Sequence, residues 1–167
     1  MIINFEDLSK IRNENINKKI VFCSGSFDIT HVGHIIFFEE CNKYGNILIV
    51  GVGSDKMLRY HKGGNRPILN EHIRLKTIDS FKCVDYSFID SVSTPDEPLI
   101  LLRCVFESLK PDFYLINDDA FDIPYRERVC EEFKVKLIIL KRWCPPEFED
   151  ISTSKIIEKI KNLDKSN

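Results

Sequence analysis

Short apolar segments alternate with longer segments of helical spacing along most of the chain, and this alternation constrains the fold more than any other feature. Apolar residues predict strands at residues 19–24, 46–52, 86–89, 112–116 and 135–140. Helical spacing predicts helices at residues 33–43, 70–81, 97–109, 124–133 and 152–163. Because strands that alternate with helices are typical of β-α-β units, we predict an α/β fold with a doubly wound parallel sheet of about five strands.

A chain of 167 residues with 43% apolar side chains has the size and composition of a single domain, residues 1–167. Residues 1–15 form an N-terminal extension before the first predicted strand, and the polar tail 161–167 is expected to fray. We expect Gly45 to end the first long helix in the left-handed conformation and Ser152 to cap the last helix. In doubly wound folds ligands bind beyond the carboxyl ends of strands, so the loops after strands one, two and four should carry the site.

Charge and cysteine usage exclude several classes of function. The 24 Lys and Arg residues and 26 Asp and Glu residues give a net charge of −2 without a long basic block, so we expect no nucleic-acid or membrane partner. The six cysteines show no CxxC pair, which favours reduced thiols over a zinc site or a disulfide framework. No signal-like segment or apolar run of ~20 residues is visible. We expect a cytoplasmic protein that binds a small molecule.

The segment 25–34 leaves the first predicted strand, opens the first long helix and carries the strongest chemical signal. Gly25 and Gly33 let the backbone approach a ligand closely, and the free N–H groups of a helix start favour an anion. His31 and His34 lie three residues apart, so both can donate to one phosphate chain. The pair could instead be helix-start hydrogen bonders, or bind a metal, although no acidic or thiolate ligand has a recognisable zinc spacing.

These features fit in-line attack on the α-phosphorus of a nucleotide. Such chemistry rests on positioning and on donors aimed at oxygens that gain negative charge, a role that suits His31 and His34. Asp28 is predicted to be a structural acceptor that shapes the turn rather than a base. The segment 60–66 combines two glycines with three potentially cationic side chains, which predicts a flap that closes over phosphates, with a solvated hinge as the alternative.

Residues 25–34 resemble the GxFDxxHxGH signature of the cytidylyltransferase-like nucleotidyltransferase superfamily. A second block, residues 54–74, resembles the SD…KG…RP…R stretch of the heptose-phosphate adenylyltransferases, and residues 151–157 are similar to the ISTT-x-I-I helix start near the family's C-terminus. The three blocks follow the family's order and cover most of the chain. The resemblance implies a Rossmann-like nucleotide-binding fold, transfer assisted by Mg²⁺ that accompanies the NTP, and a homodimer.

The resemblance also implies roles for individual residues. Catalytic roles are implied for His31, His34 and Lys62. Nucleotide binding is implied for Ser26, Phe27, His31, Gly33, His34, Arg74, Asp119, Ile151, Ser152, Thr153 and Ser154. Binding of the phosphorylated acceptor is implied for Lys62, Arg66, Asp118 and Arg142, and no residue is assigned to a metal. Taken singly, Lys62 could be a solvated lysine, Arg74 a surface salt-bridge partner and Ser152 only a helix cap.

Two segments depart from the resemblance. Residues 115–121 differ from the Lys-Gly-Gly-Asp-Tyr pattern of the heptose enzymes and from the Gly-Asp-Asp-Trp pattern of the glycerol-phosphate cytidylyltransferases, and only Asp119 agrees with both. Residues 141–150 are longer than the expected link, and Arg142 stands in for an arginine that follows the last strand of cytidylyltransferases. Trp143 and Phe148 are expected to pack in the core rather than to stack on a base or to close a dimer interface.

We therefore predict a nucleotidyltransferase that moves a nucleoside monophosphate from an NTP to a sugar phosphate or polyol phosphate and releases pyrophosphate. ATP is favoured slightly over CTP because the second block matches the adenylyltransferases. Two alternatives stay open, a nucleotide-binding module without turnover and an adenylyltransferase for a coenzyme precursor such as a flavin or pantetheine phosphate. Pyrophosphate release that needs both an NTP and an acceptor excludes the module, and the identity of the acceptor separates the two enzymes.

Overall fold

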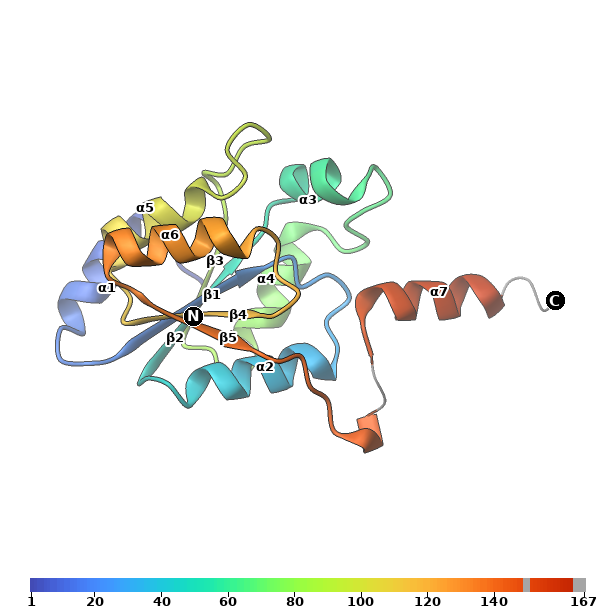
Figure 1. The fold of residues 1–167 in the computed structure, drawn as a ribbon. Coiled ribbons are helices and arrows are strands. Elements are labelled where there is room, and N and C mark those ends of the chain that lie inside the picture. Colours follow the sequence, from blue (N-terminus) through green and yellow to red (C-terminus); the bar gives the residue numbers. More distant parts are fainter. Residues whose placement is uncertain (149–150, 164–167) are drawn as a thin grey trace.

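Five parallel strands form one sheet in the computed structural model, which describes residues 1–148 and 151–163. The strands are β1 (Ile20–Gly25), β2 (Ile47–Val52), β3 (Tyr86–Ile89), β4 (Phe113–Asn117) and β5 (Lys136–Leu140). They lie in the order β3-β2-β1-β4-β5, and each neighbouring pair is parallel (Figure 1). Every predicted strand is therefore confirmed, and so is the doubly wound α/β fold.

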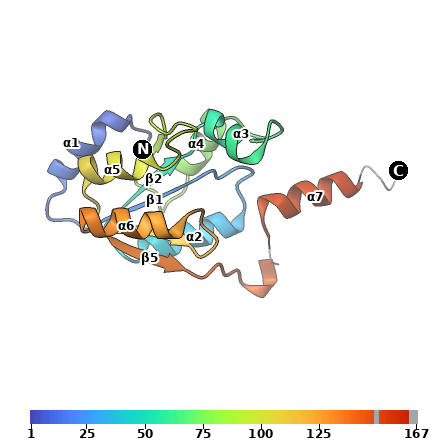
Figure 2. The same ribbon diagram turned by 45° about the horizontal axis from the view of Figure 1, so that its top comes forward.

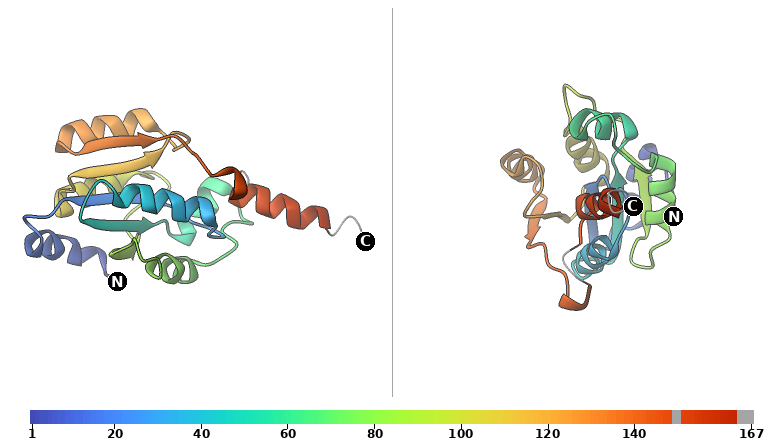
Figure 3. Two further views of the ribbon diagram at one scale, coloured as in Figure 1. Left: turned by 90° about the horizontal axis from the view of Figure 1, so that it is seen from below. Right: turned by 90° about the vertical axis from the view of Figure 1, so that its right-hand side faces the viewer.

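Helices cover both faces of this sheet (Figure 3). One face carries α2 (Val32–Asn42) and α4 (Glu71–Asp79), and the other carries α1 (Leu8–Glu14), α5 (Ile100–Leu109) and α6 (Ile123–Phe133). Side chains alternate along a strand, so Phe22 of β1 packs with the α5 and α6 layer while Cys23 packs with the α2 and α4 layer. The sheet is thus buried between two apolar layers, which explains why its central strands are mostly apolar.

The direction of winding reverses between β1 and β4. From β1 the chain passes through α2 to β2 and then to β3, and α5 carries it back to the other side of β1, where β4 and β5 follow. The connections that leave β1 and β4 diverge, and their carboxyl ends border a crevice in which doubly wound folds bind ligands. The fold therefore predicts a site at the edge where the loops after β1, β2 and β4 meet.

The N-terminal residues are part of the packed fold and not a separate extension. A short 3-10 helix, η1 (Phe5–Asp7), leads into α1, whose Leu8 and Ile11 side chains are buried in the layer that contains α5. Helices α1 and α5 lie side by side in Figure 2. The sequence did not predict α1, because seven residues carry too little apolar periodicity to define a helix face.

A helix also replaces part of the predicted flap. The segment after β2 forms α3 (Asp55–Lys62), which buries Met57 and Leu58. Gly63 ends this helix with a φ of 87°, a conformation that glycine adopts without steric cost. The irregular part of the predicted flap is therefore confined to residues 63–66.

Gly45 does not end α2 in the left-handed conformation, so that expectation is wrong. The helix ends at Asn42, and the right-handed Lys43 follows it. A Cβ atom on Gly45 would lie 2.7 Å from the carbonyl oxygen of Lys19. Glycine is needed here because the chain that enters β2 passes against the start of β1.

The C-terminal segment leaves the sheet and forms η2 (Pro146–Phe148) and α7 (Thr153–Leu163). Helix α7 projects away from the sheet in Figure 1, and no residue of it is fully buried. It stays helical to Leu163, so the predicted fraying does not begin at residue 161, and residues 164–167 lie outside the described part of the chain. Trp143 is 64% exposed and Phe148 is 46% exposed, so the expectation that they pack in the core is wrong.

Candidate active site

The turn that follows β1 is held in an unusual backbone conformation. Phe27 and Ile29 both have positive φ, and the ring of Phe27 crosses Gly25 so closely that a Cβ there would lie 2.9 Å from it. The carboxylate of Asp28 is buried and accepts hydrogen bonds from the N–H groups of Ile68 and Leu69. Asp28 therefore ties this turn to the loop that leads into α4, as predicted for a structural acceptor.

The two predicted histidines come together at the start of α2. His31 is the N-cap residue, and its Nδ1 accepts from the N–H of Gly33 at 3.2 Å. The Nδ1 of His34 accepts from the N–H of His31 at 3.3 Å. The two ring centroids are 4.0 Å apart, and the His31 Nε2 is buried without a protein partner in the described chain.

These hydrogen bonds assign the protonation of both rings. A neutral imidazole that accepts at Nδ1 carries its proton at Nε2, so each ring keeps one N–H for a ligand. Burial, and then the positive charge of Arg142, lower the pKa of His31. Burial, followed by the charges of His31 and Arg142, lowers the pKa of His34 to about 3. Both histidines are therefore neutral donors at physiological pH.

Two cations reach the site from the end of α3 and from the loop that follows this helix. The Nζ of Lys62 donates to the Oγ of Ser26 at 2.9 Å, across the mouth of the β1 turn. Burial, and then the charge of Arg66, lower the pKa of Lys62. The Nε of Arg66 donates to the Asp28 carboxylate at 2.9 Å. The sequence placed both residues in a mobile loop, whereas the structure fixes each by a contact to the β1 turn.

Arg74 has a different place from the one that the resemblance implies. Its side chain is fully buried, with Nη1 donating to the carbonyl of Ser26 at 2.6 Å and Nη2 paired with Asp55 at 2.8 Å. Its Nε donates to the carbonyl of Leu69. All three nitrogens of the guanidinium are thus occupied by protein, and Arg74 does not line the cavity described below.

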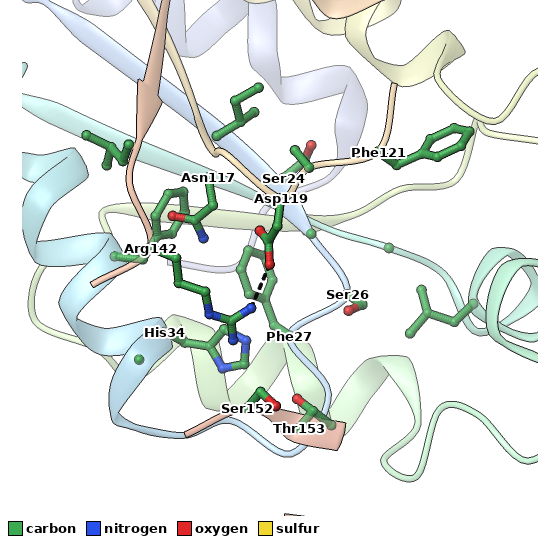
Figure 4. Close-up of a pocket in the computed structure, with 18 of the residues that line it drawn as sticks. Ser24, Ser26, Phe27, His34, Asn117, Asp119, Phe121, Arg142, Ser152 and Thr153 are labelled. Atoms are coloured by element: carbon green, nitrogen blue, oxygen red, sulfur yellow. Dashed lines mark hydrogen bonds and ion pairs between the residues drawn. The ribbon is translucent and has the colours of Figure 1, made fainter. Parts of the chain in front are cut away.

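Loops after β4 and β5 contribute an ion pair. The Nη1 of Arg142 lies 2.7 Å from the carboxylate of Asp119, and a dashed line marks this ion pair in Figure 4. The backbone N–H of Arg142 donates to Asp118, whose exposed side chain does not line the cavity. Arg142 also lies close enough to the two histidines for its charge to lower the pKa of both. The long link between β5 and α7 therefore begins inside the site.

The start of α7 returns to the turn after β1, although the two are far apart in the sequence. The hydroxyl of Thr153 donates to the carbonyl of Asp28 at 2.6 Å. The Oγ of Ser152 accepts from the N–H of Lys155, which is the capping role predicted for it. In Figure 4, Ser152 and Thr153 lie below the ring of His34. The start of a helix thus lies beside His34, and the N-terminus of a helix favours anions.

Together these groups line one cavity of about 1190 Å³ at the carboxyl edge of the sheet. The predicted site residues that it brings together are Ser26, Phe27, His31, Gly33, His34, Lys62, Arg66, Asp119, Arg142, Ile151, Ser152, Thr153 and Ser154. Three of them are cations, and neutral N–H donors lie among them, so the cavity suits a chain of phosphates. Within residues 1–148 and 151–163, no three His, Cys, Asp or Glu side chains gather as a metal site.

The cavity also contains residues that the sequence analysis missed. On the face covered by α5 and α6, its wall includes Ser24, Asp90 and Arg126. One signal was available for Arg126, because it lies three residues from both Ile123 and Val129 on the apolar face of its helix. A charged residue within such a stripe needs a partner, and its position therefore marks a site.

Comparisons with known proteins agree with this geometry. The family model described as "Cytidylyltransferase-like" matches residues 22–159. The "Bifunctional protein HldE" of Helicobacter acinonychis is 37% identical over 161 residues, which cover 96% of this chain and 31% of that protein. The protein of the same name from Campylobacter jejuni strain RM1221 is 36% identical over 166 residues, 96% of this chain and 32% of its own length. The chain thus spans about a third of these relatives.

Solved structures show the same fold. A lipopolysaccharide core biosynthesis protein from Thermoplasma volcanium superimposes with a TM-score of 0.63 at 27% identity, and the match covers 76% of this chain and 99% of that one. A pantoate-beta-alanine ligase from Francisella tularensis superimposes with a TM-score of 0.60 at 15% identity, over 96% of this chain and 77% of that one. The second likeness shows the fold alone.

Proposed function

The chain belongs to the cytidylyltransferase-like family of nucleotidyltransferases, and on this premise we propose that it transfers a nucleoside monophosphate from an NTP to a sugar phosphate or polyol phosphate. Pyrophosphate is the second product. The observation that carries the proposal is the histidine pair, because His31 and His34 each keep an Nε2–H while their Nδ1 atoms are held by the backbone. Both rings line a cavity that also contains Lys62 and the start of α7.

The reaction needs no protein base. An oxygen of the acceptor phosphate forms a bond to the α-phosphorus, and the bond from that phosphorus to the oxygen bridging the α- and β-phosphates breaks. The pyrophosphate leaves with the bonding electrons. A phosphate acceptor is already ionised near pH 7, since its second pKa is about 6. This chemistry is consistent with a site whose histidines are neutral and whose Asp28 carboxylate is occupied by backbone N–H groups.

Each group in the cavity then has a role in positioning and charge stabilisation. His31 and His34 donate their Nε2–H groups to phosphate oxygens that gain charge as the α–β bond breaks. Lys62 offsets charge on the reacting phosphates, because its ammonium is a compact point charge on a flexible stem. The N–H groups and hydroxyls of residues 152–154 hold the terminal phosphates, and Arg142 exchanges Asp119 for a phosphate when the NTP binds. The two imidazoles and the helix start contribute without any change in their own protonation.

Mg²⁺ fits this site as a partner of the NTP. Magnesium keeps several waters and is usually held by substrate phosphates with one or two carboxylates. The described residues offer no cluster of three or more candidate ligands, so the phosphates would supply most of the ion's ligands other than water. It would neutralise charge on the departing pyrophosphate. The protein side chains named above would act on the remaining oxygens.

The finer assignments rest on resemblance. ATP is favoured because residues 54–74 resemble the heptose-phosphate adenylyltransferases, and a sugar phosphate is favoured because a structural relative is named for lipopolysaccharide core biosynthesis. Trp143 lines the cavity and is exposed, so it can contact the base. The homodimer and the cytoplasmic location stay predictions. No helix in the described chain is long and apolar enough to cross a membrane.

A matrix of substrates tests the proposal. Pyrophosphate release is measured with Mg²⁺ while ATP, CTP, GTP and UTP are each combined with a heptose 1-phosphate, glycerol 3-phosphate, 4′-phosphopantetheine and FMN. We expect release from ATP with the sugar phosphate and none when the acceptor is omitted. Release with only 4′-phosphopantetheine or FMN would identify a coenzyme adenylyltransferase. NTP binding in calorimetry without release from any pair would identify a binding module instead.

A further inference from the structure

The buried and half-buried arginines of this protein are held by carboxylates, with one exception among the described residues. Arg12, Arg66 and Arg74 each lie within 3.0 Å of an Asp oxygen. Arg126 is also buried, with 8% of its surface exposed, yet no carboxylate of residues 1–148 or 151–163 lies within 4.0 Å of its guanidinium. A buried cation without a counter-charge costs free energy that an anionic ligand can offset.

Two of the Arg126 donors are fixed by the protein. Nε donates to the carbonyl of Phe121 at 2.6 Å, and Nη1 donates to the hydroxyl of Tyr114. Burial raises the pKa of Tyr114, so its hydroxyl stays neutral and adds no negative charge. Within the described chain, the second terminal nitrogen, Nη2, makes no hydrogen bond. Because Arg126 lines the cavity, this nitrogen is the donor available to a ligand.

Arg126 lies on the opposite face of the sheet from the histidines. Helix α6 belongs to the layer with α1 and α5, whereas α2, which begins with the histidine pair, belongs to the other layer. Ser24 contacts the same Tyr114 hydroxyl as Arg126. Ser24 and Ser26 are two positions apart at the end of β1, at most about 7 Å along the chain, and Ser26 holds Lys62 at 2.9 Å. The guanidinium and Lys62 are thus linked across the end of β1.

A cavity with cations on two sides suits in-line displacement. The attacking oxygen and the departing pyrophosphate must lie on opposite sides of the α-phosphorus. The histidines, Arg142 and the start of α7 gather on the α2 side, where they suit the triphosphate. With the triphosphate on that side, the side of α5 and α6 is left for the attacking phosphate, and there Arg126 is the cation that lines the wall.

We propose that Arg126 anchors the phosphate of the acceptor. Its guanidinium, preset by Phe121 and Tyr114, binds that phosphate on the α6 side of the cavity and holds one of its oxygens toward the α-phosphorus. This inference rests on the proposed function and adds to it the residue that selects a phosphorylated acceptor. Asp90 is the carboxylate on the same wall, and it already accepts from the N–H groups of Val92 and Ser93. Arg126 is therefore the group on this wall that binds the anionic part of the ligand.

Kinetics of Arg126→Gln tests the proposal. The control is Arg128→Gln, which removes the same charge from an exposed position on the same helix. We expect Arg126→Gln to raise the KM for a heptose 1-phosphate by about 10- to 100-fold, as for loss of a hydrogen bond to a charged group, while the KM for ATP changes less than twofold. Arg126→Lys should recover part of the loss because it keeps the charge. Arg128→Gln should change neither constant.

A binding measurement separates this proposal from the proposed function. Protein saturated with α,β-methylene-ATP, which fills the triphosphate site without reacting, is titrated with inorganic phosphate in a calorimeter. We expect the wild type and Arg128→Gln to bind phosphate and Arg126→Gln not to, even if no acceptor supports turnover. Equal phosphate binding by the wild type and Arg126→Gln, or a KM increase for ATP alone, would overturn the assignment.

Discussion

The hydroxyl of Thr153 donates a 2.6 Å hydrogen bond to the backbone carbonyl of Asp28, which joins the first turn of the site to the last helix. The carboxylate of the same Asp28 binds the N–H groups of Ile68 and Leu69. One residue thus holds three segments together that are distant in the sequence. The site is assembled by hydrogen bonds between side chains and backbone groups around Asp28.

Removal of the Thr153 hydroxyl should loosen α7 from the site. Thr153→Val keeps the shape of the side chain but loses the hydrogen bond to Asp28. We expect stability to fall by about 1 kcal/mol and the Kd for ATP to rise by about 5- to 10-fold, because α7 buries no residue fully and depends on few contacts. Urea unfolding and calorimetry measure the two effects. Thr153→Ser should match the wild type, and an unchanged ATP affinity in Thr153→Val would show that α7 is not part of the nucleotide site.

Asp28→Asn should destabilise the protein and change its response to acid. Burial would raise the pKa of Asp28, but N–H groups of Leu69 and Ile68 and the charge of Arg66 hold it below its usual value. The carboxylate therefore contributes stability above about pH 4, and this contribution is lost as the pH falls through the folded-state pKa. We expect a loss of about 2–4 kcal/mol at pH 7, because Arg66 loses its counter-charge.

Urea unfolding of Asp28→Asn and the wild type across a pH series checks this account. The stability difference between them should shrink as the pH falls below about 4, where the wild-type carboxylate takes up a proton. A difference that stays constant to low pH would contradict the ionised state assigned to Asp28.

Substitution of Arg74 should lower the stability of the protein more than it weakens nucleotide binding. Arg74→Met leaves Asp55 without its 2.8 Å partner and frees two buried carbonyl groups, so we expect a loss of about 3–5 kcal/mol. Arg74→Lys keeps the charge and should recover part of that loss, with an ATP affinity within a few-fold of the wild type. A well-folded Arg74→Lys variant that binds ATP more than 10-fold more weakly would show that Arg74 contacts the nucleotide.

The positions of the strands along the chain and the residues of the first turn were predictable because their signals are local. Apolar runs define β1 and its neighbours, and residues 25–34 carry the glycines and histidines together. Helix α3 was not predictable in the same way, since two glycines after it resemble a mobile loop and only Met57 and Leu58 mark its buried face. Its helical state depends on packing against the body of the protein, which no local pattern encodes.

The partners of side chains that distant segments hold could not be predicted from the sequence either. Arg74 and Arg126 are both buried, but one pairs with Asp55 and the other faces the cavity, and these partners come from other elements. The spacing of charges along α4 or α6 contains no information about them. The exposure of Trp143 follows from the path of the link after β5, which leaves the sheet, and aromatic character alone predicted the opposite.

His34 should stay neutral over the range in which histidines normally titrate. Because burial lowers the pKa of His34 to about 3, its ring signals in NMR should not shift between about pH 8 and pH 5. In the unfolded chain, His34 takes up a proton near pH 6.5. Its contribution to the free energy of unfolding is therefore fully present above that pH and falls as the pH decreases below it. His34→Gln should reduce this fall. A His34 titration near pH 6.5 would contradict the neutral-donor role.

The central claim is that His34 stabilises the transition state for transfer at the α-phosphorus, and single-turnover pyrophosphate release with ATP and its sugar-phosphate acceptor tests it most directly. His34→Ala should lower the rate by about 100- to 1000-fold while the Kd for ATP changes only a few-fold. His72→Ala, a histidine removed from an exposed position on α4, should match the wild type. A His34→Ala variant that is folded, binds ATP and retains the wild-type rate would contradict the account.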